Sequence, residues 1–567
     1  MKLISLFTAL LLVFSVDGSA QTAVHLRCEH LVNPIGVDAL QPRLSWKMSA
    51  GIRQTGYEVI IGTDSAAVAR SSSVKKIEGN DQLVTLSVNT KPFTRYYWKV
   101  ILWNEKNTRL PASEITWFET GMMNASNWKG FWLSDVYGTN VEEKKAPYFR
   151  KSFRTGKKIR SARAYIAAGG LYELSINGKT IGDHRLDPIY TRYDRRTLYV
   201  THDVTSVLQE GNNAIGVLLG NGWYNHQSTA VWNFEHAPWR NRPTFCMDLR
   251  ITYTDGTVET IITDNSWKTA HGPLLFNSIY TAEHYDFRLE QKDWNTPGFD
   301  YSKWNRVYYR TAPSQNLVGQ LLVPIRDVEV IRPVSMKKLD NGNYLFDLGR
   351  NISGVVQLRV KGNSGTTLRL RHAERLLPDG HTDQSNIDVH YRPVGTADPF
   401  QTDVIILSGK QDVFRPRFNY KGFQYVEISS DQPVTLTGAD LTGFFTHSDV
   451  EPIGRISSSN PVIDKIWFAT NNSYLSNLMG YPTDCPQREK NGWTGDAHIA
   501  SETGLYNFDA QTVYEKWMAD HAMNSSRTGF YPPLFPPVDG VTNGATVPTG
   551  PARSPLFPGT CTCLPVM

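Results

Sequence analysis

Apolar and polar residues alternate along most of the chain, in three successive stretches separated by turn residues. The alternation is clear in Tyr57–Ile61, in Leu171–Ile176 and in Gly422–Ile428. A period of two places every second side chain on the same face of a strand, so these stretches predict β-sheets with one buried face. After residue 455 the apolar residues recur every three or four positions, which predicts helices. The order indicates a multidomain chain in which β-sandwich domains precede an all-helical domain.

Turn residues set the boundaries of the three β-domains. We expect a fibronectin type III-like sandwich at residues 23–121, because roughly seven short strands fit into this length. A jelly-roll sandwich is predicted at residues 125–315, where Asn177–Gly178 provides a hairpin turn between alternating runs. A third sandwich is predicted at residues 320–447.

The helical domain is predicted at residues 455–567. Asn460 is a good N-cap, Pro461 is a good first helical residue, and Gly480 is suited to a C′ position after the first helix. Further helices are expected from near Asp496 and from about Asp509 to Ser525.

Length and composition narrow the class of protein. With 567 residues the chain is too long for one hydrophobic core. The net charge of +5 is small for this size and argues against a nucleic-acid-binding surface. The 15 Trp and 26 Tyr suit surfaces that stack on sugars, although β-sandwich cores also use aromatic residues.

The N-terminus has the pattern of a secretory signal. Lys2 precedes the apolar run Leu3–Val16, and the small residues Gly18–Ala20 follow. We expect cleavage near Ala20 and a secreted or periplasmic protein. The apolar run is too short to span a bilayer comfortably, and no later stretch is long and apolar enough.

The five cysteines are too sparse for a disulfide framework. A Cys28–Cys246 bridge stays open, whereas a metal site at Cys561-x-Cys563 is disfavoured because no other ligands lie nearby. The acidic run Asp383–Asp388 lacks the spacing of a calcium loop and is interpreted as a polar loop. No metal or cofactor is predicted.

The segment Asp484–Asp496, Asp-Cys-Pro-Gln-Arg-Glu-Lys-Asn-Gly-Trp-Thr-Gly-Asp, is the most unusual of the chain. It links two predicted helices and holds three carboxylates, an Arg and a Trp. Glycosidic cleavage needs one carboxylic acid to protonate the leaving oxygen and a second carboxylate as base or nucleophile. A Trp beside a carboxyl excludes water and raises its pKa. The composition suits sugar chemistry.

This segment resembles the signature of family 78 α-L-rhamnosidases, Asp-Cys-Pro-x-Arg-Glu-x-x-Gly-Trp-x-Gly-Asp, at every position. Phe346–Asn351, His372–Glu374 and Gly220–Tyr224 are similar to that family's sandwiches. The resemblance runs from about Leu26 to Gly550. It implies an exo-acting, inverting glycoside hydrolase that removes terminal α-L-rhamnose from glycans or glycosides, with an (α/α)6-barrel catalytic domain of which this chain holds the start.

The resemblance also implies roles for the matched positions. Glu489 corresponds to the general acid. Asp484 and Asp496 correspond to carboxylates that bind sugar hydroxyls, Trp493 to a wall of the rhamnose pocket, and Arg488 to a residue beside the pocket.

Each residue also has a structural interpretation. Asp496 could serve as an N-cap, and Asp484 could fix a turn. Glu489 could be a solvated surface charge, Arg488 could pair with a nearby carboxylate, and Trp493 could belong to the core. The neighbouring Cys485 is interpreted as a small buried residue and not as a nucleophile, because no His is placed to activate it.

The family's general base is a Glu far downstream, and no residue of this sequence is matched to it. The tail after Gly550 loses helical periodicity, and a neighbouring reading frame of Pro558–Cys563 permits an apolar helical segment. We therefore expect a frameshift after Gly550, an incomplete barrel with exposed apolar helix faces, and weak or absent catalysis. A carbohydrate-binding multi-sandwich protein without catalysis is the alternative. A third possibility is another helical-barrel hydrolase or a polysaccharide lyase. A lyase would need a Tyr or His base beside a charge-neutralising group, and the Asp484–Asp496 signature argues against it.

Overall fold

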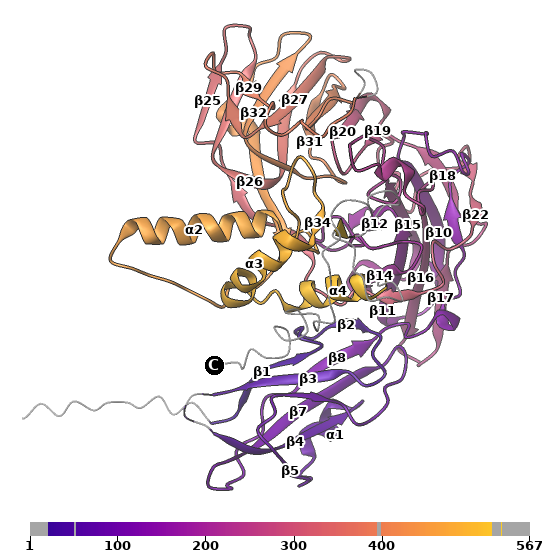
Figure 1. Ribbon diagram of the computed structural model, residues 1–567. Helices are drawn as coiled ribbons and strands as arrows, with labels where there is room; N and C mark the ends of the chain where they lie inside the picture. The colour runs from indigo at the N-terminus through magenta and orange to yellow at the C-terminus, as the bar shows by residue number, and fades with distance from the viewer. Residues whose placement is uncertain (1–20, 50, 52, 394–397, 524–533, 536–567) are drawn as a thin grey trace, which may run out of the picture. The chain divides into compact units, whose positions relative to one another are not determined.

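The computed structural model describes residues 21–49, 51, 53–393, 398–523 and 534–535 (Figure 1). The predicted signal peptide and the predicted frameshift lie outside the described residues. The chain forms two compact units. The first is Leu40–Glu119 with the described residues up to Pro34, and the second is Ile35–Ala39 with the described residues from Thr120 onward.

The first unit is built from two antiparallel sheets. Trp98 and Phe118 are fully buried in it, and Asp64 caps its short helix by accepting hydrogen bonds from two main-chain N–H groups. The first sheet has the order β1 (Ala23–Cys28), β3 (Arg43–Met48), β6 (Leu83–Thr85), and the second β8 (Thr116–Thr120), β7 (Arg95–Asn104), β4 (Gln54–Gly62), β5 (Ile77–Glu78); the helix is α1 (Ser65–Arg70).

The second unit begins with two larger sheets that enclose an apolar core of their own, which includes Phe149, Ile166, Val217 and Trp267. One sheet has the order β13 (Lys179–Thr180), β12 (Leu171–Ile176), β15 (Gly211–Gly220), β10 (Pro147–Thr155), β18 (Lys268–His271), β21 (Asn305–Arg306). The other has the order β22 (Tyr308–Arg310), β9 (Trp132–Ser134), β16 (Thr244–Tyr253), β11 (Ile159–Gly169), β14 (Thr197–Asp203), β23 (Leu317–Gly319), with β17 (Val258–Ile262) beside β16. We refer to these two sheets and their loops as the jelly-roll sandwich.

The predicted hairpin turn at Asn177–Gly178 is confirmed. It joins β12 to β13, and both residues have positive φ angles, 52° and 82°. This conformation matches the twist of a two-residue hairpin and favours Asn and Gly.

A ten-stranded sheet forms the next layer, and we call it and its loops the third sandwich. Its strands β19 and β20 come from the stretch predicted as jelly roll, and β20 runs parallel to β30. The order is β19 (Leu274–Asn277), β20 (Glu283–Asp286), β30 (Thr402–Ile406), β27 (Thr367–Ala373), β32 (Lys421–Ser430), β26 (Tyr344–Lys361), β33 (Leu441–Ser448), β24 (Ile325–Ile331), with β25 (Ser335–Lys338) and β31 (Gln411–Phe414) paired to β26 and a separate ribbon of β28 (Arg375–Leu376) and β29 (Thr382–Asp383).

Three helices follow within residues 454–523: α2 (Pro461–Ser476), α3 (Thr494–Asn507) and α4 (Gln511–Ala522) (Figure 1). The N-cap prediction is confirmed, because the Asn460 side chain accepts a hydrogen bond from the Val462 N–H at 3.0 Å. Gly480 has a φ of 75° but lies beyond the C-cap Asn477, so the predicted C′ position is wrong. The third helix buries Val513 and Trp517 as predicted.

The predicted apolar face of α2 is buried only near its C-terminal end. Tyr474 and Leu478 are buried, whereas Val462 and Ile466 are 59% and 60% exposed. The buried end packs on β26 and β33 of the third sandwich and on α3. The first half of α2 therefore presents an apolar face that no other described residue covers.

Each helix in the described part of the chain is too short or too polar to cross a membrane. Cys28, Cys246 and Cys485 are free and buried, so the bridge left open between the first two is not formed. In the run interpreted as a polar loop, Asp383 is paired with Arg375, and Asn386 donates a hydrogen bond to Glu374.

Candidate active site

The segment with the sugar-hydrolase signature forms a closed loop between α2 and α3. The Asp484 N–H donates to the Asn491 carbonyl at 2.9 Å, and the Asn491 N–H donates to Asp484 Oδ1 at 2.9 Å. These reciprocal bonds close the base of the loop. The loop ends in the short strand β34 (Gly492–Trp493), which pairs with β35 (Leu534–Phe535) and leads directly into α3.

Glu489 is held near the tip of this loop by nitrogen-bearing side chains. Its Oε2 accepts a hydrogen bond of 2.7 Å from Trp493 Nε1. Its Oε1 lies 3.3 Å from His390 Nε2 and 3.9 Å from Arg488 Nε. The side chain is 12% exposed, so it is largely enclosed but open to an incoming molecule. A carboxyl in this position can exchange a proton with a bound ligand.

Asp484 is the carboxyl of the loop whose pKa is raised. Burial raises the pKa of Asp484 to about 7, and the nearby charge of Glu489 adds to the effect. The thiol of Cys485 donates to Asp484 Oδ2 at 2.8 Å. Burial also raises the pKa of the Cys485 thiol above its ordinary value, which agrees with the interpretation of this residue as buried and not nucleophilic.

Trp493 and Asp496 stand at the start of α3. Trp493 is the N-cap residue, and its indole packs edge to face on Trp232 with the ring centroids 5.2 Å apart. Asp496 is the third residue of the helix, not the N-cap, so that interpretation is wrong. Its side chain is exposed, and a carboxylate in the first turn is favoured by the helix dipole.

Arg488 is the most exposed of the predicted site residues in the loop tip. Its side chain is 46% exposed and reaches Glu489 at 3.9 Å. Its main-chain carbonyl accepts a hydrogen bond of 2.7 Å from the Tyr280 hydroxyl of the neighbouring sandwich loop. The backbone is thus anchored while the guanidinium is available to a ligand.

Lys490 fixes the loop to the β-domains, and sequence analysis did not single it out. It is fully buried, and its Nζ donates to the carbonyls of Ile279 and Tyr420 at 2.7 and 2.5 Å. The ammonium also lies 4.2 Å from the Tyr420 ring centroid. Its place directly after Glu489 was the only sequence signal, and a Lys in a loop is normally solvated.

Two further contacts hold the loop on the third sandwich. Gln487 Nε2 donates to Glu374 Oε1 at 2.9 Å. Pro486 packs so closely on Gly422 that a Cβ at Gly422 would lie 2.8 Å from the proline ring. The β-domains therefore position the loop that carries the candidate site residues.

An Asp484→Asn variant should change how stability depends on pH. Because the folded pKa of Asp484 is raised above its ordinary value, the stability that it contributes is present below about pH 4 and is lost as the pH rises through about 7. Asn does not titrate. Thermal unfolding of both proteins should show Asp484→Asn gaining stability relative to the parent between pH 4 and pH 8. A stability difference between the two proteins that stays constant over this pH range would contradict the burial of the carboxyl.

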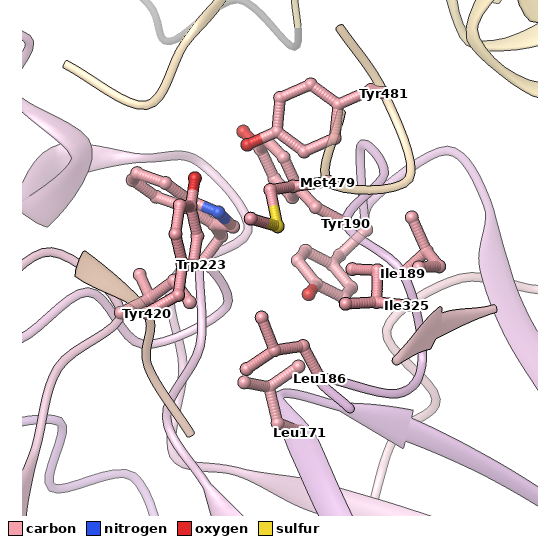
Figure 2. A pocket seen from close by; sticks show the side chains of 11 residues that line it. Leu171, Leu186, Ile189, Tyr190, Trp223, Ile325, Tyr420, Met479 and Tyr481 are labelled. Carbon is pink, nitrogen blue, oxygen red and sulfur yellow. The ribbon is translucent and has the colours of Figure 1, made fainter. Parts of the chain in front are cut away.

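A small cavity lies beside the loop. Its volume is about 20 Å³, which is room for about one water molecule. Figure 2 shows Met479 and Tyr481, from the stretch that follows α2, meeting Tyr190, Trp223 and Tyr420 around it. The cavity is too small for a sugar ring, and Glu489 and Arg488 are not among the residues that line it.

Comparisons with known proteins agree with this arrangement. Domain models of bacterial α-L-rhamnosidases match successive parts of the chain: an N-terminal immunoglobulin domain at residues 23–124, the α-L-rhamnosidase N-terminal domain at 157–329, the concanavalin-like domain at 337–447 and the six-hairpin glycosidase domain at 451–550.

Individual proteins give the same result. An α-L-rhamnosidase of Formosa agariphila is 30% identical over 540 residues, which are 86% of this chain and 54% of that protein. The solved α-L-rhamnosidase of Dictyoglumus thermophilum is 36% identical with a TM-score of 0.83, covering 91% of this chain and 59% of that one. The structure from Aspergillus terreus is 30% identical with a TM-score of 0.81, covering 92% and 60%.

The chain thus spans little more than half the length of these relatives. The matching domain models follow one another in the order of the observed sandwiches and helices. The chain belongs to the bacterial α-L-rhamnosidases of glycoside hydrolase family 78.

Proposed function

We propose that the chain binds and hydrolyses terminal α-L-rhamnosyl residues of glycans or glycosides, with inversion at the anomeric carbon and with Glu489 as the general acid. The observation that carries the proposal is the enclosed Glu489 carboxyl, held by Trp493 Nε1 at the edge of an exposed loop. A general acid needs this fixed position and partial exclusion of water.

The remaining loop residues have supporting roles in this proposal. Asp484 and Asp496 hydrogen-bond rhamnose hydroxyls, Trp493 packs against the sugar ring and Arg488 borders the pocket. The proton that burial holds on Asp484 near neutral pH makes this residue a donor as well as an acceptor. In the reaction, Glu489 gives its proton to the glycosidic oxygen while the bond to the anomeric carbon breaks. Water attacks the opposite face of the ring and loses one proton to a base or to the solvent.

We also propose the wider context of this site. Helices α2, α3 and α4 are the first helices of an (α/α)6 barrel. Residues 1–20 direct export, which makes the protein secreted or periplasmic. The resemblance matches no position of residues 1–567 to the family's base.

The test is hydrolysis of a rhamnosyl-α-1,6-glucose disaccharide by the chain from Gln21 onward. A sugar alkoxide is a poor leaving group, so release of rhamnose needs the proton that Glu489 supplies in this proposal. Any release should disappear in Glu489→Gln, and the first sugar product seen by proton NMR should be the β-anomer. Release that persists undiminished in Glu489→Gln would contradict the assignment of the acid.

A further inference from the structure

Two aromatic side chains from the β-domains stand beside the candidate acid. His390 Nε2, from the loop of the third sandwich, lies 3.3 Å from Glu489 Oε1. Trp232, from a jelly-roll loop, packs edge to face on both His390 and Trp493, with ring centroids 5.5 and 5.2 Å apart. The three rings and the carboxyl therefore form one cluster, to which each of the three structural parts of this unit contributes.

Main-chain bonds fix His390 and Trp232 relative to each other. The Val231 N–H donates to the His390 carbonyl at 3.1 Å, and the Arg392 N–H donates to the Thr229 carbonyl at 2.9 Å. Ala230 forms an antiparallel bridge with Tyr391 in between. The two loops are thus paired like strands.

A buried carboxyl clamps the same loop a few residues farther on. Asp398 accepts hydrogen bonds from Ser228 Oγ, on a jelly-roll loop, at 2.7 Å and from Thr281 Oγ1, in the turn between β19 and β20, at 2.5 Å. Burial raises the pKa of Asp398 to about 6. This clamp and the paired loops give His390 a defined position next to the carboxyl of Glu489.

The two oxygens of Glu489 have different surroundings. Trp493 Nε1 carries a hydrogen and can only donate, so Oε2 must act as an acceptor for it. Oε1 faces His390 and Arg488. Oε1 is therefore the oxygen better placed to carry and deliver the proton, and the group that leaves from rhamnose must pass close to His390.

We propose that His390 and Trp232 line the leaving-group side of the pocket and recognise a ring attached to rhamnose. This inference rests on the proposed function. His390 is 31% exposed and Trp232 is partly buried, so each can offer part of its ring to a flat ligand. Such surfaces suit an aryl group or the face of a second sugar, and they make His390 and Trp232 specificity-determining residues of the reaction.

The experiment measures binding, so it does not depend on turnover. In the Glu489→Gln background, calorimetry gives the Kd of three ligands: methyl α-L-rhamnoside, 4-nitrophenyl α-L-rhamnoside and a rhamnosyl-α-1,6-glucose disaccharide. We expect one or both ring-bearing ligands to bind about three- to tenfold more tightly than the methyl glycoside. The pair of ring-bearing ligands shows whether an aryl or a sugar ring is preferred.

Variants assign the difference to the two side chains. His390→Ala and Trp232→Ala should each abolish most of the ring preference and leave the Kd of methyl α-L-rhamnoside within about twofold. Trp232→Phe keeps an aromatic ring and should retain part of the preference. Exposed His236 and Tyr308, both in the jelly-roll stretch, provide His236→Ala and Tyr308→Ala as matched controls without effect.

Three results would overturn the inference in different ways. Equal binding of all three ligands by the parent would show that no ring is recognised. An equal loss of affinity for all ligands in the variants, including Trp232→Phe, would indicate a structural role. Failure of the parent to bind even methyl α-L-rhamnoside would refute the proposed function itself, and the inference with it.

Discussion

Replacing Asp520 by alanine should release α4 from the jelly-roll sandwich. The Asp520 side chain is fully buried and receives the guanidinium of Arg196, the ammonium of Lys516 at 2.8 Å and the hydroxyl of Thr191 at 2.7 Å. Lys516 also donates to the Tyr190 carbonyl. These contacts join α4 to the jelly-roll loop between β13 and β14.

Without the carboxylate, two cations stay buried without their shared counter-charge. Breaking a buried ion pair by removing one partner costs about 3–5 kcal/mol. The amide hydrogens of α4 should then exchange about 10²–10³-fold faster, since about 1.4 kcal/mol corresponds to a tenfold change. Hydrogen exchange read by mass spectrometry on peptides from residues 511–522 gives this change directly.

Two variants separate charge from packing in this cluster. The triple variant Arg196→Met, Lys516→Met, Asp520→Leu removes all three charges together and should restore most of the protection of α4. Glu502 is an exposed acidic residue of α3, and Glu502→Ala should leave the protection of the α4 amides unchanged. Slow exchange of α4 in Asp520→Ala would show that the cluster does not hold the helix.

Replacing Lys490 by alanine should release the loop that carries Glu489. The change leaves the carbonyls of Ile279 and Tyr420 without their donor and opens a cavity where the lysine chain was. The two effects together amount to about 2–5 kcal/mol. Exchange of the amides in residues 481–493 should rise accordingly, and the affinity for α-L-rhamnosides should fall with it.

Lys490→Met distinguishes the two effects, because methionine fills most of the space but donates no hydrogen bond. We expect the amide exchange rates of the loop in Lys490→Met to lie between those of the parent and those of Lys490→Ala. Lys465→Ala, an exposed lysine on α2, serves as the control. Loop amides that exchange at the parent's rate in Lys490→Ala would mean that the other contacts of the loop, such as that of Gln487 with Glu374, suffice to hold it.

Local patterns in the sequence predicted the local structure well. The alternation in Tyr57–Ile61 lies in β4, and Asn177–Gly178 forms the hairpin turn. Asn460 caps α2. In each case the information is contained in neighbouring residues, because side-chain periodicity, φ preference and capping act over a few positions.

Contacts between residues far apart in the chain could not be predicted from the sequence. Nothing near β19 indicates that it joins the ten-stranded sheet, and an exposed first turn of α2 could not be told from a buried one by its apolar spacing. Lys490 looks like a surface residue until its carbonyl partners, 211 and 70 positions away, are known. Likewise, His390 carries no local sign of its place beside Glu489.

The candidate site itself was found through the signature and not through physical reasoning alone. The structure brings Glu489, Arg488 and Trp493 together, with Asp484 at the base of the same loop. Among the carboxyls of the loop, it is Asp484, at the closed end, whose pKa burial raises. Which carboxyl is buried depends on tertiary packing, so the sequence could not show which one has the raised pKa.

Calorimetric titration of the chain from Gln21 onward with L-rhamnose tests the central claim, that residues 484–496 form a rhamnose pocket. This measurement needs neither a base nor turnover. The account predicts saturable binding to one site, which is lost in Trp493→Ala because the wall of the pocket is removed. Absence of binding by the parent, or equal binding by parent and Trp493→Ala, would contradict it.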